Sequence, residues 1–241
     1  MGYIFSYQDS ITYEKLLQDP RNRFISDLQN WLVMDLLKPM KGQSVLGIGC
    51  GTGTSLSPFI QMGLQVSGLD PSPYMLDVAE KKLGHRVDLH RGVGEDLPFE
   101  DNSFNYACLI TALEFVENPR KTIEEATRVA KDKLFLSVMN RYAIKSVKTR
   151  IKGVSADAIY SQARFFSIWE LLRINRTVSG YVPVSWRSAS QIPKDRGKII
   201  SSFQRSKVVK WYPFGTFIGI SVTLIPRYRT MPLTVAFSAK P

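Results

Sequence analysis

The sequence predicts an α/β fold with a doubly wound, mostly parallel sheet that carries helices on both faces. A short apolar run at 44–48 stops in a glycine-rich turn at 49–53, as a buried parallel strand does before a nucleotide-binding turn. Apolar runs then alternate with helical patterns as far as residue 139, which indicates stacked βαβ units with right-handed crossovers. A chain of 241 residues can bury such a core as a single domain.

Two helices are expected before the first strand. Ser10 or Thr12 caps the first, and apolar residues at helical spacing over 24–36 form the inner stripe of the second. This stripe is expected to pack on the sheet. An alternative role for this region is that Tyr7 or Tyr13 closes over a ligand as a lid.

The alternating part of the chain divides into five strands and three helices. The strands are expected at 44–48, 65–69, 87–90, 103–110 and 134–139, and the helices at 55–62, 71–83 and 118–129. Asp70 follows the second strand and lies 21 residues after Gly49. An acidic side chain at that position can accept both hydroxyls of an adenosine ribose.

The pattern changes after Asn140. Helices are expected at 156–166 and 168–174, the second with a capping box formed by Ser167 and Glu170. A strand is expected at 178–184, and the apolar segment 214–225 is expected to form a hairpin that closes the sheet. That segment is too short to cross a bilayer as a helix. Residues 185–210 are polar and basic and predict no element.

Charge is distributed unevenly along the chain. Residues 1–130 hold 12 Lys+Arg and 17 Asp+Glu, a net charge of −5, whereas 131–241 hold 20 and 4, a net charge of +16. The basic half predicts an anionic partner, which could be a membrane surface, a nucleic acid or an acidic substrate. The alternative is a basic face that serves solubility alone.

Cysteine usage and the N-terminus bear on location. Cys50 and Cys108 have no metal-ligand spacing, so we expect neither a metal site nor a disulfide. The first residues lack the basic and apolar regions of a secretory signal. The sequence therefore predicts a cytoplasmic protein.

Three motifs in order carry a family resemblance: VLGIGCGTG, GLDPSPYMLDVAEKK and GVGEDLPFEDNSFNYACLITALEFVENP. They resemble the class I S-adenosylmethionine-dependent methyltransferases, and most closely the small-molecule type that includes quinone and sterol methyltransferases. RFFSIWELLRI also resembles a helix of that family, so the resemblance spans roughly residues 25–180.

The resemblance implies a Rossmann-like, seven-stranded sheet with a reversed last strand, N-terminal helices and a helical, basic insertion after strand five. Residues 1–42 would form the N-terminal helices, 43–140 the cofactor-binding half, and 141–241 the substrate-side elements and last strands. The implied cofactor is S-adenosylmethionine, the donor in methyl transfer.

The resemblance also implies the cofactor site. The turn at 49–53 would pass under the methionine part, Asp70 would bind the ribose, and the Gly94 loop would meet the adenine. The implied set is Gly47, Gly49, Cys50, Gly51, Asp70, Pro71, Met75, Gly94, Glu95, Asp96, Ile110 and Thr111.

Two positions depart from the family pattern. Gly47 stands where the family usually has an acidic residue that helps to hold the ammonium group of the cofactor. Loss of such a charge-assisted contact costs on the order of 1–3 kcal/mol. Val93 stands where the family often has an Asp that accepts from the adenine amino group, and Glu95, Asp96 or backbone carbonyls are the candidates to replace it.

Methyl transfer from a sulfonium needs alignment of the reacting atoms more than it needs acid–base groups. No catalytic base is assigned, because His85 and His90 flank the third strand and are expected on its surface. Glu114 is a candidate for contacting the acceptor, with Arg141 and Tyr142 as candidate pocket residues.

Three hypotheses about function follow. The first is a methyltransferase for a small or lipid-like acceptor that is anionic or associated with a membrane surface. The second is an RNA or DNA methyltransferase, which the basic half favours. The segment 110–113 disfavours it, because it lacks the Asn/Asp-Pro-Pro-aromatic motif of base-amino methylation. The third is a non-catalytic binding protein, motivated by Gly47 and Val93.

Overall fold

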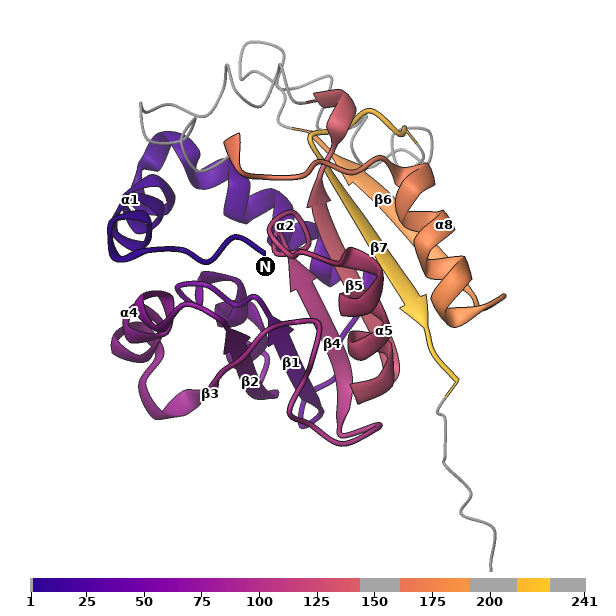
Figure 1. Cartoon of the computed structure of the whole chain (residues 1–241), viewed down its shortest axis with the longest axis horizontal. Helices are drawn as coiled ribbons and strands as arrows, with labels where there is room; N and C mark the ends of the chain where they lie inside the picture. Colours follow the sequence, from indigo (N-terminus) through magenta and orange to yellow (C-terminus); the bar gives the residue numbers. More distant parts are fainter. Residues whose placement is uncertain (1, 144–160, 191–211, 226–241) are drawn as a thin grey trace, which may run out of the picture.

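The computed structural model describes residues 2–143, 161–190 and 212–225 (Figure 1). Its strands are β1 Ser44–Ile48, β2 Gln65–Asp70, β3 Asp88–Arg91, β4 Phe104–Ile110, β5 Ala130–Met139, β6 Val184–Ala189 and β7 Phe217–Thr223. Its α-helices are α1 Tyr7–Gln18, α2 Arg23–Leu36, α3 Ser57–Gln61, α4 Pro73–Leu83, α5 Pro119–Val129 and α8 Ile168–Ser179. Short 3₁₀ turns lie at Pro20–Asn22, Thr54–Leu56, Gly84–Arg86 and Arg141–Ala143.

All seven strands form one sheet in the order β3-β2-β1-β4-β5-β7-β6. The first five strands are parallel to one another, and β7 runs antiparallel to its two neighbours, β5 and β6. The predicted parallel sheet with one reversed strand is therefore confirmed. The carboxyl ends of β1, β2, β4 and β5 and the start of β7 meet along one side, which we call the carboxyl edge.

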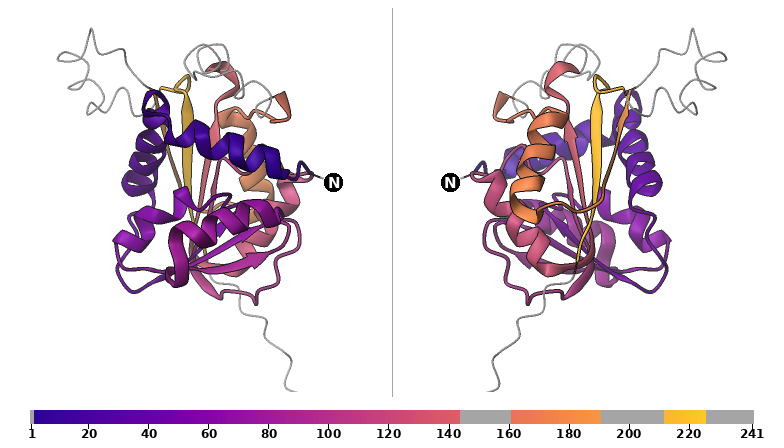
Figure 2. Two further views of the ribbon diagram at one scale, coloured as in Figure 1. Left: turned by 90° about the vertical axis from the view of Figure 1, so that its left-hand side faces the viewer. Right: turned by 90° about the vertical axis from the view of Figure 1, so that its right-hand side faces the viewer.

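Helices cover both faces of the sheet (Figure 2). Successive residues of a strand point to opposite faces, so Phe135 of β5 packs with the α2 and α3 side chains, whereas Leu134 and Leu136 pack with α5 and α8. The N-terminal helices thus belong to one apolar layer and α5 and α8 to the other. This three-layer arrangement leaves the carboxyl edge free for a site.

The hairpin expected at 214–225 is wrong, because β7 is a single strand that inserts between β5 and β6. Gly219 lies in the middle of it. A Cβ at Gly219 would come within 2.9 Å of the Leu36 side chain and 3.2 Å of that of Leu32. This glycine therefore permits close packing of α2 on β7 and does not mark a turn.

The strand expected at 178–184 is also wrong. Helix α8 continues to Ser179, and Gly180 with φ 74° follows it. Val178 packs against the core from within the helix, which outweighs its β-branched preference for a strand. The strand begins only at Val184 and extends into the region that predicted no element.

Side chains cap α4, α5 and α8, and the cap of α8 at Ser167 is one that the sequence predicted. Ser72, Asn118 and Ser167 accept the backbone N–H three residues on, at 3.3, 3.1 and 3.2 Å. Helix α1 begins earlier than predicted, because Ser6 forms a capping box with Asp9. The predicted capping box at Ser167 is only half formed, since the Glu170 carboxylate pairs with arginines instead.

The helix expected at 156–166 lies largely outside the described residues, and 163–166 is extended, with Phe166 bridging to Asn140. Most of the predicted basic insertion likewise lies outside them. In the ranges that the structure covers, no helix has both the length and the apolar character needed to cross a membrane.

Candidate functional site

A pocket opens at the carboxyl edge, over the ends of β1, β2 and β4. The space between its walls, counted together with the open solvent at its mouth, is about 1150 Å³. Ten of the predicted cofactor residues line it: Gly49, Cys50, Gly51, Asp70, Pro71, Met75, Gly94, Glu95, Ile110 and Thr111. Gly47 and Asp96 do not.

The glycine turn supplies the floor of the pocket through its backbone. Gly49 and Cys50 donate their N–H groups to the carbonyl of Leu69, at 2.7 and 3.0 Å. Gly49 has φ 67°, and a Cβ there would lie 2.5 Å from that of Ala112. Gly51 has φ 54°, but a Cβ there would meet no atom within 4 Å. Gly49 thus serves packing, whereas Gly51 leaves open space in which a ligand can approach the backbone.

Asp70 stands at the end of β2 with its carboxylate fixed at both oxygens. Oδ2 accepts the N–H of Gly51 at 2.8 Å, and Oδ1 accepts that of Ser72 at 2.9 Å. The residue is almost fully buried, and this burial raises the pKa of its carboxyl although the two N–H donors oppose the rise. An ionised carboxylate can accept about four hydrogen bonds, and two of these come from the backbone, so Asp70 can still accept hydrogen bonds from a ligand.

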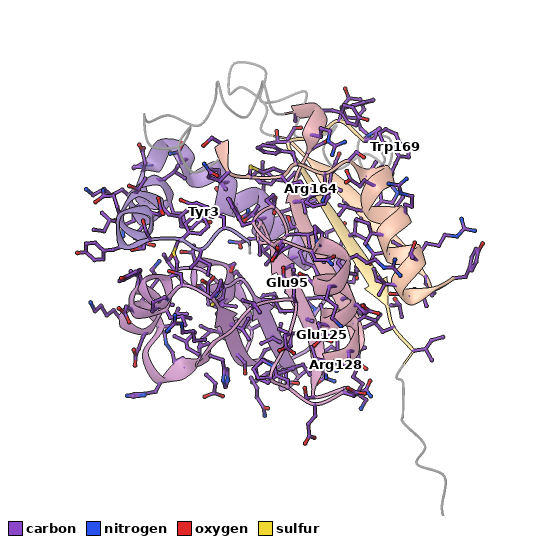
Figure 3. All side chains as sticks on the ribbon, viewed as in Figure 1. Tyr3, Glu95, Glu125, Arg128, Arg164 and Trp169 are labelled. Atoms are coloured by element: carbon purple, nitrogen blue, oxygen red, sulfur yellow. The ribbon has the colours of Figure 1, made fainter. Side chains whose placement is uncertain are left out.

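The loop after β3 forms the wall opposite the glycine turn. A Cβ on Gly94 would lie 2.8 Å from Thr122, so only glycine lets the loop approach α5 so closely. Glu95 Oε1 accepts the N–H groups of Glu117 and Asn118 at 2.9 and 3.1 Å. Glu95 therefore fixes the entry to α5 with that oxygen (Figure 3). Asp96 is exposed on the outer side of the loop.

An ion-pair network on α5 anchors the same loop (Figure 3). Arg128 contacts Glu125 and Asp101 at 2.7 and 2.9 Å and donates to the carbonyls of Leu97 and Phe99 at 3.0 and 2.7 Å. Its hydrogen bonds hold the pKa of the Glu125 carboxyl below its usual value against the effect of burial. Arg128 therefore stabilises the loop after β3 from a position outside the pocket.

The end of β4 carries a strained residue. Thr111 has φ 50°, a conformation that is rare for a β-branched side chain. Its N–H donates to the Ser137 carbonyl at 2.7 Å, and Gln29 Nε2 donates to its Oγ1 at 3.2 Å. Strain of this kind persists where surrounding contacts enforce it, and it often marks functional sites.

The N-terminal segment covers the pocket, which the sequence did not predict. Tyr3 N–H donates to the Phe115 carbonyl at 2.8 Å, and Ser72 Oγ donates to the Phe5 carbonyl at 2.6 Å. The rings of Tyr3 and Phe115 lie 5.2 and 5.0 Å from that of Phe5 between their centroids. These three rings form an aromatic wall of the pocket between the residues after β2 and the loop after β4.

Helix α1 holds this cover in place. Tyr13 lines the pocket and interacts with Thr111, and burial raises the pKa of its hydroxyl to about 12. Glu14 forms an ion pair with Lys82 of α4 at 2.7 Å. Of the two predicted lid residues, Tyr13 lies at the pocket, whereas Tyr7 is exposed and packs on Tyr74.

Gly47 has a packing role in this structure. A Cβ there would lie 2.4 Å from Cδ2 of Leu56, which is buried. Leu56 therefore occupies the space that an acidic side chain at position 47 would need. The second departure, Val93, lies on the pocket wall with 38% of its surface exposed.

The remaining candidate residues lie away from the pocket wall. His85 and His90 lie beyond it, next to and in β3. Glu114 is buried and does not lie on the wall. Its Oε1 accepts the Met139 N–H at 2.7 Å, whereas its Oε2 has no hydrogen-bond partner among the residues that the structure describes. Burial raises the pKa of its carboxyl to about 8. Arg141 and Tyr142 follow β5 outside the pocket.

Metal ligands do not cluster in the described part of the chain, where no three His, Cys, Asp or Glu side chains could hold an ion. Cys50 and Cys108 are both free and buried, and burial raises the pKa of each thiol.

Comparison with known sequences agrees with this geometry. The family model Methyltransf_11, described as a methyltransferase domain, matches residues 46–137. An uncharacterised protein of Methanocaldococcus jannaschii is 32% identical over 182 residues, which is 75% of this chain and 82% of that protein. A demethylmenaquinone methyltransferase of Renibacterium salmoninarum is 39% identical over 100 residues, 42% of each chain.

Solved structures share the fold. A methyltransferase of Thermotoga maritima, described as a possible histamine N-methyltransferase, superposes with a TM-score of 0.64 at 21% identity, covering 90% of this chain and 96% of that one. Magnesium protoporphyrin IX methyltransferase of Synechocystis, with bound S-adenosylhomocysteine, gives 0.60 at 15% identity, covering 89% and 93%. The chain therefore belongs to the class I S-adenosylmethionine-dependent methyltransferases, in the Methyltransf_11 family.

Proposed function

We propose that the pocket holds S-adenosylmethionine against the glycine turn, with Asp70 accepting from the ribose hydroxyls and the Gly94 loop beside the adenine. The observation that carries this proposal is the buried Asp70 carboxylate, which is oriented by two backbone N–H groups and keeps acceptor capacity on the pocket side. The open space over Gly51 supports it, because a ligand can lie directly on that backbone.

The ammonium end of the cofactor would lie near Ile110 and Thr111, without a carboxylate from position 47. Leu56 fills that space, so backbone carbonyls at the ends of β1 and β4 would take over the contact. Replacing a charge-assisted contact by neutral acceptors weakens binding by on the order of 1–3 kcal/mol. We therefore propose a functional but weakened cofactor site.

When bound, the cofactor supplies a methyl group on a sulfonium, and the protein positions an acceptor in line with it. Among the described wall residues there is no histidine, and Tyr13 keeps its proton at neutral pH because its pKa is about 12. Tyr13 would thus donate a hydrogen bond and hold the acceptor. The proposed acceptor carries a nucleophile that needs no protein base.

The acceptor proposed here is small and partly apolar. Tyr3, Phe5 and Phe115 supply an aromatic wall, and Gln29 and Asn30 supply the polar groups that would orient the ligand. The similarity to demethylmenaquinone methyltransferase supports a lipid-like acceptor of this kind. The free, buried thiols of Cys50 and Cys108 suit the reducing cytoplasm, and we propose that the chain works there as one domain.

Transfer of a labelled methyl group tests the proposal. The full chain is incubated with methyl-labelled S-adenosylmethionine and either an organic-soluble cell extract or total RNA. Label should enter the organic-soluble fraction, and Asp70→Asn should abolish it, while Asp77→Asn, on the exposed side of α4, should not. Label in RNA alone would favour the nucleic-acid reading instead. Cofactor binding without any transfer would favour a non-catalytic protein, which the Gly47 environment motivates.

A further inference from the structure

Four aromatic side chains gather on the surface at the carboxyl edge, apart from the pocket. Tyr142, Trp169, Tyr212 and Phe214 form this aromatic cluster, and each leaves 46–56% of its surface exposed. Phe214 is the hub, with ring centroids 5.7, 6.4 and 5.3 Å from those of Tyr142, Trp169 and Tyr212. Exposed aromatic rings that contact one another on one surface indicate an interaction surface.

The cluster is held on a fixed frame. Asn140 is fully buried, and its Nδ2 donates to the carbonyls of Pro213 and Gly215, on either side of Phe214, at 2.8 Å each. Ser188 Oγ donates to the Tyr212 carbonyl. These bonds fix the backbone so that the Phe214 ring points outward. The exposure is therefore built into the fold.

Arginines lie close to the cluster in the chain. Arg141 and Arg164 share the carboxylate of Glu170, the residue after Trp169, at 2.9 and 2.7 Å, so this group keeps one net positive charge. Arg173 is exposed four residues after Trp169, on the same face of α8.

We propose that the aromatic cluster docks the protein on an anionic lipid bilayer. Tyr and Trp prefer the membrane interface, where the ring body is apolar and the tip is polar, and Phe214 adds an apolar centre. Basic residues are attracted to the negative surface potential of an anionic bilayer. A nucleic acid would also match the charge, but its bases bind by stacking on the faces of aromatic rings. These rings already contact one another edge to face, so they offer little free face for stacking.

The position of the cluster gives the docking a purpose, which rests on the function proposed above. The end of β5 pairs with the start of β7 through Met139 and Phe217, so the cluster and the pocket share the carboxyl edge. A bilayer that touches the cluster would face the edge on which the pocket opens. A lipid-like acceptor could then pass from the bilayer to the pocket over a short path.

Co-sedimentation with vesicles tests the proposal. The full chain is spun with vesicles of phosphatidylglycerol mixed with phosphatidylcholine, and with phosphatidylcholine alone. The wild type should partition onto the anionic vesicles. Trp169→Ser/Phe214→Ser should lower that partition by about tenfold or more, because two interfacial anchors are lost. Tyr181→Ser is the matched control: this tyrosine follows the other end of α8, is 86% exposed, and should leave partition unchanged.

Other outcomes have set meanings. The docking proposal would be overturned if the double variant partitioned as the wild type does, or if the wild type did not bind anionic vesicles. It would also be overturned if the double variant kept its vesicle binding and instead lost binding to a single-stranded RNA. Binding of S-adenosylhomocysteine, measured in parallel by calorimetry, separates the two proposals. If S-adenosylhomocysteine binds but the vesicles do not, the docking proposal is wrong and the proposed function stands. If the vesicles bind but S-adenosylhomocysteine does not, the proposed function is wrong and the docking proposal stands.

Discussion

The carboxyl edge has two contrasting regions. Over β1, β2 and β4, the chain builds a covered pocket from backbone, with glycines at positive φ and one oriented carboxylate. Over β5 and β7, it builds an exposed cluster from aromatic side chains held by a buried asparagine. The parts of the chain that form the two regions also differ in net charge, which is −5 over residues 1–130 and +16 over residues 131–241. One edge of one sheet can thus separate the binding of a small ligand from docking on a large surface.

The largest expected effect tests how far the pocket depends on backbone. Gly49→Ala combines strain at φ 67° with a Cβ 2.5 Å from that of Ala112, so it should destabilise the fold by about 3–5 kcal/mol. Gly51→Ala bears only the strain, and should cost about 1–2 kcal/mol while placing a methyl group in the ligand's space. Urea unfolding of both variants measures the difference. Equal losses would contradict the separate roles given to these glycines.

A smaller effect on stability is expected from Glu114, which lies between the pocket and the aromatic cluster. Glu114 links the end of β4 to β5 through the Met139 N–H and to Arg164 through its own carbonyl. Burial raises its pKa from 4.5 to about 8, so between these values the native state holds a proton that the unfolded chain has lost. Stability should therefore fall as pH rises from about 5 to 8, by on the order of 2–4 kcal/mol from this group.

Glu114→Gln removes the titration and keeps an acceptor for Met139. Its unfolding free energy should change little over the same pH range, so the two proteins should be similar near pH 5, where Glu114 is neutral, and differ most at pH 8, where the variant should be the more stable. Parallel pH profiles for the wild type and the variant would show that Glu114 is not the group that titrates.

The smallest effect concerns the adenine side of the pocket. Val93→Asp adds an acceptor on the exposed wall and should tighten S-adenosylhomocysteine binding by about 1 kcal/mol, roughly fivefold. Gly47→Asp alone should instead destabilise the protein, because Leu56 fills its space. Adding Leu56→Ala should relieve that clash. Thermal shift with and without ligand separates the two effects, and a Gly47→Asp variant as stable as wild type would count against the packing role.

The sequence predicted what local chemistry determines. Asp70 follows directly from the end of an apolar run, and the helix at 118–129 follows from a helical pattern, and the structure has both close to the expected positions. The apolar segment 214–225 does not by itself distinguish a hairpin from one strand, because the place of Gly219 within a strand depends on how α2 packs on it. The end of helix α8 at Ser179 likewise depends on tertiary packing, because Val178 contacts the core from within the helix.

The pocket cover lay beyond prediction for a similar reason. Gly2 to Phe5 carries no periodic pattern, and its place is set by Ser72 and Phe115, which lie far away in sequence. The aromatic cluster likewise joins residues from three separate elements. Contacts of this kind become visible only when the fold brings distant segments together.

The central claim is that the oriented Asp70 carboxylate makes this pocket a cofactor site. Calorimetric titration of S-adenosylhomocysteine into the wild type, Asp70→Asn and the exposed control Asp77→Asn tests it most directly. One ligand should bind per wild-type chain and per Asp77→Asn chain, and Asp70→Asn should bind roughly 10- to 100-fold more weakly, as expected for loss of charged hydrogen bonds. Equal affinity of all three proteins, or no heat from the wild type, would contradict the claim.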